Sequence, residues 1–309
     1  ANIVYTEGKM LDDLMRGRIA LRMCRRNRLG IVIDRNVVEP PAEAVAMGAR
    51  NELNRVLNAV NAVRAVNGVE VIGYRVTAAP IGARAVLAET GASHGNIENV
   101  DTLLTAAQAL IQAGAEAIAV VTRILDITEE MEKYYSQKGG PDPIGGIEAI
   151  LSHLIVAECG VPAAHAPANA TDLGAFDNVD EITDPRLAAE LISHTFMPCI
   201  LQGLARAPRI IPLAAVQQND IVVDQINAVV APVNALGGIP MLEGVRRRIP
   251  VIAIKENQTI LDVTAEKLGI QQHVILAENY LEAAGILAAL KAGIDWRMVR
   301  RPLAALREI

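Results

Sequence analysis

The segment AVVAPVNALGGIPMLEGVRRRIPVIAI, residues 228–254, indicates the fold most clearly. It contains an apolar run at Ala228–Ala231, a glycine turn and helical pattern at Gly237–Arg247, and a second apolar run at Pro250–Ile254. A strand, a helix and another buried strand in this order are typical of a parallel sheet covered by helices. The pattern continues with a predicted short helix near Thr264–Leu268, a strand at Val274–Leu276 and a closing helix at Asn279–Ala292.

The same alternation of apolar runs and helical patterns extends through the earlier part of the chain. Predicted strands are Gly30–Asp34, Val69–Val76, Ala117–Val121 and Val161–Ala164. Predicted helices are Leu11–Arg26, a long one from Pro40 to Gly68, Asn99–Ala113, Ile147–Glu158 and Arg186–Leu204, whereas Ala79–Asn96 has the composition of a loop. We therefore predict an α/β fold, a Rossmann-like parallel sheet layered with helices.

The number of domains is left open by the sequence. One interpretation is an α/β domain at residues 1–207 and a smaller Rossmann-like unit at 208–309, and the alternative is a single domain. The 309 residues suffice for either arrangement.

Composition narrows the class of protein and of partner. Hydrophobic residues make up 51% of the chain, but no window of about 20 residues is apolar enough to span a membrane. The net charge of −6 and the small size of the basic clusters, Arg22–Arg28 and Arg246–Arg248, argue against nucleic acid. The three cysteines are dispersed and suggest a reducing compartment. We expect a cytoplasmic protein with neither nucleic acid nor membrane as a partner.

Polar residues at the predicted strand ends are the candidates for a site, because ligands of parallel sheets bind at the carboxyl ends of strands. Ser93, His94 and Asn96 lie in a glycine-containing turn, and His94 could act as general acid or base. His165 follows a short strand and is the second catalytic candidate. The alternative for the His94 segment is a tight turn with an asparagine N-cap, and the alternative for His165 is a histidine that bonds to carbonyl groups of the loop.

The remaining candidates serve anion binding or hold a carboxylate near the ligand. Arg123 and Arg206 could bind a carboxylate or phosphate, and the Gly237-Gly238 turn could bind an anion through backbone N–H groups. Glu256, the third catalytic candidate, and Asn257 follow the strand at Pro250–Ile254. We predict that His94, Arg123, His165 and the glycine turn follow strands of one parallel sheet and line one pocket.

A metal centre is not indicated. Glu148 and His153 are five residues apart and so do not share one face of a helix, and no histidine or cysteine spacing matches a zinc site. We expect no metal and no cofactor. Cys199 and His194 are more plausibly structural than catalytic.

Several of these segments resemble an uncharacterised family, a domain of unknown function known mainly from cyanobacteria and plants. The matching segments are Gly91–Asn96, Val121–Ile124, Asp142–Gly146, Ser152–Leu154, Ala164–Ala168, Thr195–Cys199, Ala205–Pro208 and Glu256–Thr259. The resemblance implies a common fold and carries no reaction. The family often has a cysteine before its His-Ala-Pro segment, where this chain has Ala163 and Ala164, which argues against a Cys–His pair at His165.

These features favour an enzyme that acts on a small, polar, anionic metabolite by His/Glu acid–base chemistry with backbone anion binding. The reaction would be of the lyase, hydrolase or isomerase type. One alternative is a non-catalytic metabolite or nucleotide sensor, and another is a metal-dependent hydrolase. A homo-oligomer is also expected.

Overall fold

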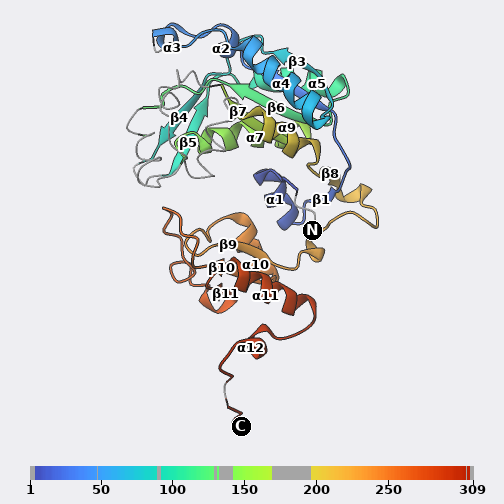
Figure 1. Cartoon of the computed structure of the whole chain (residues 1–309), viewed down its shortest axis with the longest axis vertical. Coiled ribbons are helices and arrows are strands. Elements are labelled where there is room, and N and C mark those ends of the chain that lie inside the picture. The colour runs from blue at the N-terminus through green and yellow to red at the C-terminus, as the bar shows by residue number, and fades with distance from the viewer. Residues whose placement is uncertain are drawn as a thin grey trace. The chain divides into compact units, whose positions relative to one another are not determined.

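The computed structural model of the chain describes residues 4–46, 48–88, 92–128, 131, 142–168, 196–303 and 305–306. The chain divides into two compact units. The first unit comprises Ala1–Asp13 and Ile19–Asp220, and the second comprises Leu14–Arg18 and Ile221–Ile309. Each unit is described by itself below, with the element labels of Figure 1.

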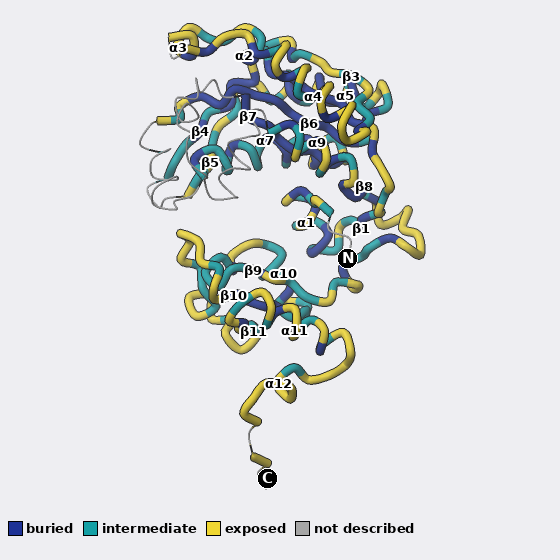
Figure 2. Tube along the Cα trace, in the orientation of Figure 1, coloured by how far each residue is buried: buried dark blue, intermediate teal, exposed yellow. Residues whose placement is uncertain are grey.

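A four-stranded parallel sheet forms the centre of the first unit. Its strands are β3 (Val71–Val76), β2 (Leu29–Ile33), β6 (Ala117–Thr122) and β7 (Ala163–Pro167), in this spatial order. Every residue of β2, β6 and β7 is buried, and these strands form the dark core in Figure 2. Apolar runs of this kind fit strands that are covered on both faces. The predicted α/β fold with a parallel sheet is confirmed.

Helices cover both faces of this sheet. On one face, α4 (Leu53–Asn67) and α9 (Met197–Ala205) pack through their apolar side chains against alternate residues of β2, β6 and β7. On the other face lie α5 (Val100–Gln112) and α7 (Gly145–Cys159), which contact each other and the sheet. The result is a three-layer arrangement of helices, sheet and helices.

Smaller elements complete the first unit. Two short helices, α2 (Arg35–Val38) and α3 (Ala42–Ala46), follow β2, and the 3-10 turn η1 (Leu213–Ala215) follows β8. β1 (Ile19–Arg22) pairs antiparallel with β8 (Arg209–Pro212). β4 (Ala83–Leu87) pairs antiparallel with β5 (Ser93–Ile97). The helix α1 (Gly8–Met15) contributes residues to both units.

The second unit repeats the architecture with fewer strands. β11 (Val274–Ala277), β10 (Val251–Ile254) and β9 (Val229–Pro232) form a parallel sheet in this order. α10 (Ile239–Arg247) packs on one face and α11 (Tyr280–Lys291) on the other. Short turns of 3-10 helix, η2 (Val223–Gln225) and η3 (Gln271–His273), and α12 (Trp296–Val299) complete it.

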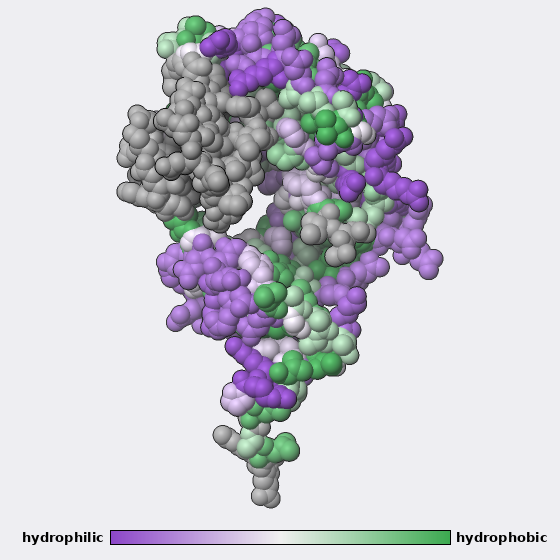
Figure 3. Space-filling model, in the orientation of Figure 1, coloured by the Kyte–Doolittle hydropathy of each residue, from purple (hydrophilic) through white to green (hydrophobic). Residues whose placement is uncertain are grey.

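The outer surface carries apolar side chains after α11. Met298, Val299, Leu303 and Leu306 are all exposed. Figure 3 shows hydrophobic side chains on this C-terminal segment. Among the described residues, no helix has both the length and the apolar character that crossing a membrane requires.

Four local predictions are wrong. The helix expected at Leu11–Arg26 ends at Met15, because Gly17 takes a positive φ of 70° and the chain turns into β1. The long helix after Pro40 is interrupted between α3 and α4. The stretch Ala79–Asn96 contains the β4–β5 hairpin, and Thr264–Leu268 forms turns. Residues 186–195 of the helix predicted at Arg186–Leu204 lie outside the described residues.

Candidate functional site

The carboxyl edge of the first unit's sheet contains a group of polar side chains, most of which are buried. The chain passes from β2 outward to β3, then returns to β6 on the other side of β2 and continues to β7. Sheets of this kind bind ligands where the strand order reverses, here between β2 and β6. Asp34 directly follows β2, whereas Thr122 and Arg123 are at the end of β6. Together with His165 of β7 and Glu148 of α7 they are called the carboxyl-edge cluster.

His165 is held through both ring nitrogens. Its Nδ1 lies 2.8 Å from Glu148 Oε1, and its Nε2 lies 2.7 Å from Thr122 Oγ1. Because a carboxylate oxygen accepts hydrogen bonds, the assignment that satisfies both contacts places the proton on Nδ1, and Nε2 then accepts from the Thr122 hydroxyl. Hydroxyl, imidazole and carboxylate therefore form a continuous chain of hydrogen bonds within distances suited to proton transfer.

Arg123 is buried beside the same strand ends. Its Nε donates to the carbonyl of Asn36 and one terminal nitrogen donates to the carbonyl of Arg50, each over 3.3 Å. Burial lowers the pKa of Arg123, and the negative charges of Glu52 and Asp34 oppose that effect. The guanidinium remains positively charged, because an arginine side chain keeps its proton in proteins. It supplies a buried cation for an anionic group.

Asp34 is fully buried, and its two carboxylate oxygens differ in their surroundings. Oδ1 accepts from the backbone N–H groups of Ile81, at 2.8 Å, and Asn36, at 3.3 Å. Oδ2 has no hydrogen-bond partner among the described residues. Burial raises the pKa of Asp34 to about 6, although the two backbone bonds and the nearby His165 and Arg123 oppose the shift.

The predicted residues Ser93, His94 and Asn96 lie elsewhere in the first unit, on strand β5. Ser93 Oγ donates to the carbonyl of Pro143 and accepts from the N–H of Gly146, both over 3.0 Å, so it holds the start of α7. His94 and Asn96 are exposed. The expectation that His94 ends a strand of the parallel sheet is wrong, because β5 belongs to an antiparallel hairpin.

Gly146 explains why β5 and α7 approach so closely. A side-chain carbon at this position would lie 2.3 Å from the carbonyl oxygen of Ser93 and 2.4 Å from Cα of His94. Only a glycine permits that backbone contact. Gly146, in the first turn of α7, therefore serves packing against β5.

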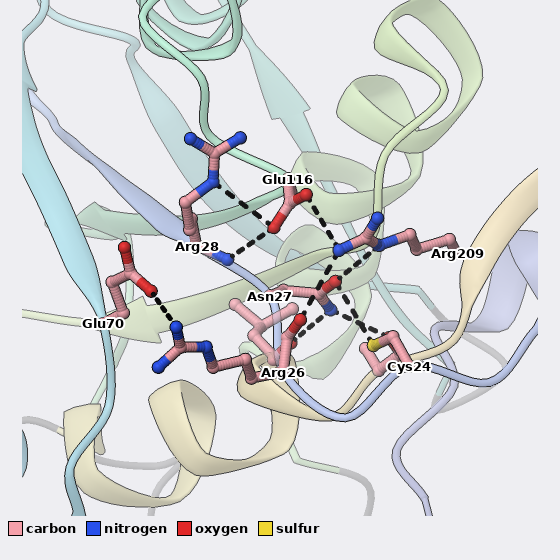
Figure 4. Close-up of polar contacts among 9 residues, drawn as sticks. Cys24, Arg26, Asn27, Arg28, Glu70, Glu116 and Arg209 are labelled. Carbon is pink, nitrogen blue, oxygen red and sulfur yellow. Dashed lines mark hydrogen bonds and ion pairs between the residues drawn. The ribbon is translucent and has the colours of Figure 1, made fainter.

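Arg206 belongs to the opposite, amino edge of the sheet. It is exposed at the end of α9, where Asn27 N–H donates to the carbonyl of Ala205 just before β2 begins. Figure 4 shows the hydrogen-bond network at this edge. The buried Asn27 side chain donates to the carbonyls of Leu204 and Ala207 and accepts from Arg209 Nε. The structure thus separates Arg206 from the carboxyl-edge cluster.

The same network accounts for part of the basic cluster Arg22–Arg28. Arg28 and Arg209 both contact the carboxylate of Glu116, and Arg26 approaches that of Glu70 (Figure 4). Burial raises the pKa of the Cys24 thiol beside them, despite the charge of Arg209. These ion pairs are structural and join the starts of β2 and β8 to the residues that precede β6 and β3.

The other predicted site residues belong to the second unit. Gly237 and Gly238 are exposed before α10, and Gly238 precedes its first residue. Glu256 Oε1 accepts from the N–H of Tyr280 over 2.7 Å, and Asn257 donates to the Tyr280 hydroxyl over 2.5 Å. Glu256 therefore satisfies a backbone donor at the start of α11.

The expectation that His94, Arg123, His165 and the Gly237-Gly238 turn follow strands of one sheet is wrong. Arg123 and His165 belong to the four-stranded sheet, whereas Gly237, Gly238, Glu256 and Asn257 follow strands of the three-stranded sheet. Hydrophobic patterns do not show which strands pair, so they left open whether the strands form one sheet or two.

Glu148 and His153 have different partners, as their spacing predicts. Glu148 bonds to His165, whereas His153 Nε2 lies 2.8 Å from Oε1 of Glu7. The hydrogen bond to Glu7 raises the pKa of His153, although burial opposes the shift. Within the described ranges, no group of three or more His, Cys, Asp or Glu side chains could hold a metal ion. His194 lies outside those ranges.

Three members of the carboxyl-edge cluster were not among the predicted site residues. Glu148 was considered only together with His153, where the spacing argued against a metal pair. Asp34 was identified only as the polar end of the predicted strand Gly30–Asp34. Thr122 was named only as part of the segment Val121–Ile124, which resembles the family. A buried apolar strand that ends directly in a carboxylate was the available signal for Asp34. Nothing local marked Thr122, because its role depends on His165 of the neighbouring strand.

Comparison with known proteins gives the chain a family. An uncharacterized lipoprotein of Synechococcus sp. is 38% identical over 296 residues, which cover 95% of this chain and 77% of the relative. A family model described as a protein of unknown function (DUF3326) matches residues 1–300. The match extends over both units and the whole carboxyl-edge cluster. This chain therefore belongs to the DUF3326 family of proteins of unknown function.

Proposed function

We propose that the protein is an enzyme that moves a proton on a small, polar, anionic metabolite at the carboxyl-edge cluster. The observation that carries the proposal is the hydrogen-bonded chain Thr122–His165–Glu148 at adjacent strand ends. A histidine whose far nitrogen is held by a carboxylate has a defined tautomer and orientation, as a general base requires. His165 is the proton-transferring group and Glu148 its positioning residue.

Arg123 supplies the binding group for the anion. It is buried, it bonds only to backbone carbonyls among the described residues, and it follows Thr122 directly. A buried guanidinium binds carboxylates and phosphates in a fixed geometry. The ligand would reach Nε2 either by displacing the Thr122 hydroxyl or by exchanging its proton through that hydroxyl.

A non-catalytic metabolite sensor is the second candidate, and one observation favours it. Both ring nitrogens of His165 are already bonded within the protein, so the histidine could serve only to hold the strand ends around a ligand. A nucleotide sensor has no such supporting contact, and neither has a metal-dependent hydrolase, so both stay predictions. So does anion binding at Gly237-Gly238.

Turnover of a small-molecule extract distinguishes the two candidates. The purified protein is incubated with the extract and the changes are followed by mass spectrometry. His165→Gln is expected to lower the rate of any conversion by about a hundredfold or more. The matched control, His273→Gln, alters an exposed histidine of the second unit and should leave the rate unchanged.

Glu148→Gln tests the positioning role of Glu148, because this variant leaves the His165 side chain in place. We expect a smaller fall, about ten- to a hundredfold, with the binding of the metabolite retained. Conversion that persists at the wild-type rate in His165→Gln contradicts the enzyme proposal. A metabolite that is retained by the protein but never converted supports the sensor instead.

We also propose a cytoplasmic location. The three cysteines are dispersed in the sequence, which supports a reducing compartment. The name of the Synechococcus relative supports the alternative, a protein held at a membrane by a lipid. Partition between detergent and aqueous phases of the native cell extract decides between them. A homo-oligomer stays a prediction, which light scattering of the purified protein would test.

A further inference from the structure

Asp34 offers an unused acceptor at the centre of the carboxyl-edge cluster. Asp34 is 0% exposed, and its Oδ1 accepts hydrogen bonds from the backbone N–H groups of Ile81 and Asn36. Oδ2 is buried without a hydrogen-bond partner among the described residues. Leaving a buried carboxylate oxygen unpaired is costly, because the oxygen has lost its water without gaining a donor. A donor from outside the described chain would remove that cost.

Arg123 offers unused donors beside it. A guanidinium has five N–H donors, and two of them reach backbone carbonyls within the described part of the chain. The residue is 4% exposed. The charges of Glu52 and Asp34 act on it, but no carboxylate of the described residues forms an ion pair with it within 4.0 Å.

The backbone places these two groups together. β2 and β6 are hydrogen-bonded neighbours in which Ile33 lies opposite Val121. The ladder continues one residue further, because the N–H of Asp34 donates to the carbonyl of Val121 over 2.8 Å. Arg123 follows Val121 by two residues and bonds back to the carbonyl of Asn36. An unused acceptor and unused donors therefore lie at neighbouring strand ends, at the reversal point of the sheet.

We propose that the ligand of this site is a small 2-hydroxy or 2-amino acid, with its carboxylate on Arg123 and its hydroxyl or ammonium group donating to Asp34 Oδ2. This inference rests on the proposed function, since it specifies the ligand of the same cluster. A simple anion would meet the negative charge of Asp34, and a simple cation would meet the positive charge of Arg123. A molecule with an anionic group and a neighbouring donor satisfies both.

Matched carboxylates test the requirement for the donor. The probes are acetate, glycolate and glycine; propionate, lactate and alanine; and succinate, malate and aspartate. Within each set only the substituent at C2 differs. We expect the hydroxy or amino form of at least one set to bind the wild-type protein about tenfold tighter than the unsubstituted form, as measured by calorimetry. Equal affinity within every set, or no binding of any probe, overturns the proposal.

Variants of Asp34 and Arg123 test which residue causes the preference for the hydroxy or amino form. Asp34→Asn should abolish the preference, because its amide presents N–H groups instead of an acceptor, while Arg123→Gln should weaken all members of a set. Asp101→Asn, which removes an exposed carboxylate of α5, should change neither. A preference that survives Asp34→Asn contradicts the assignment. If Asp34→Asn does not fold, the wild-type comparison still decides whether a donor is required.

The outcome is separable from that of the proposed function. His165→Gln should stop conversion and keep the preference among the probes. Conversion that depends on His165 without any preference for the hydroxy or amino forms would overturn the ligand class alone. A preference that depends on Asp34 without conversion would support a sensor of the same ligand class.

Discussion

Replacing Asp34 with asparagine tests whether a buried charge limits the stability of the first unit. Burial raises the pKa of Asp34 from 3.8 to about 6, so the folded unit holds this proton more tightly than the unfolded chain. Such a carboxyl group contributes stability that is fully present below the unfolded pKa and is lost as the pH rises through the folded pKa. About 2 pKa units at about 1.4 kcal/mol each correspond to about 2 to 3 kcal/mol between pH 4 and pH 8.

The prediction concerns the difference between variant and wild type. The asparagine side chain of the variant carries no charge, so the free energy of unfolding of Asp34→Asn relative to wild type should rise by about 2 to 3 kcal/mol from pH 4 to pH 8. A constant offset is also expected, because the new amide N–H groups are buried and the bonds from Ile81 and Asn36 lose their charge. The pH-dependent part is independent of that offset.

Hydrogen exchange in urea, followed in peptides from β2 and β6, measures the unfolding of the first unit separately from that of the second. Asp101→Asn is the control for the general effect of losing one exposed carboxylate. A difference that stays constant within about 1 kcal/mol over this pH range would refute the reasoning. So would a variant that is relatively most stable at pH 4.

Three further substitutions test other contacts of the structure. Asn27→Ala removes a buried carboxamide that bonds to two carbonyls and to Arg209, and should lower the free energy of unfolding by about 2 to 4 kcal/mol in urea titrations. Gly146→Ala places a carbon 2.3 Å from a backbone oxygen and should lower the melting temperature, whereas Gly73→Ala meets nothing within 4 Å and should have little effect. Glu256→Gln should leave the melting temperature nearly unchanged, and at least a tenfold loss of ligand affinity or turnover would show a functional role beyond its bond to the start of α11.

Each of these outcomes has a contrary result. Wild-type stability in Asn27→Ala would mean that the amino-edge network is solvated rather than structural. Equal melting temperatures for Gly146→Ala and Gly73→Ala would mean that β5 and α7 do not approach as closely as described. Unchanged affinity and turnover in Glu256→Gln would leave that carboxylate as a cap of α11.

The sequence alone predicted the sheet-forming strands because the signal for a buried strand is local. The apolar runs around Ile31, Val120 and Ile252 are buried on both faces, and a run of that kind can be recognised without knowing its neighbours. The helices α5, α7 and α11 were predicted nearly at their observed bounds, because the helical spacing of apolar residues is also a local signal. The class of fold and most of its β–α pattern followed from these runs.

Local patterns were insufficient where pairing partners lie far apart in the chain. β1 pairs with β8, with Ile19 opposite Pro212. Because this partner lies far away in the chain, the short sequence of β1 was mistaken for part of a helix. The β4–β5 hairpin was assigned to a loop because its glycines and polar residues resemble turn composition. Strand propensity in both places depends on packing against the neighbouring strand.

The carboxyl-edge cluster was decided by the tertiary structure. His165 and Arg123 were predicted as candidates from their positions at strand ends, but their partners were not. Thr122 is 43 residues from His165, and Ile81 is 47 residues from Asp34. Hydrophobic periodicity determines which residues enter the core, whereas a buried polar group depends on the partner that strand order places within hydrogen-bond distance.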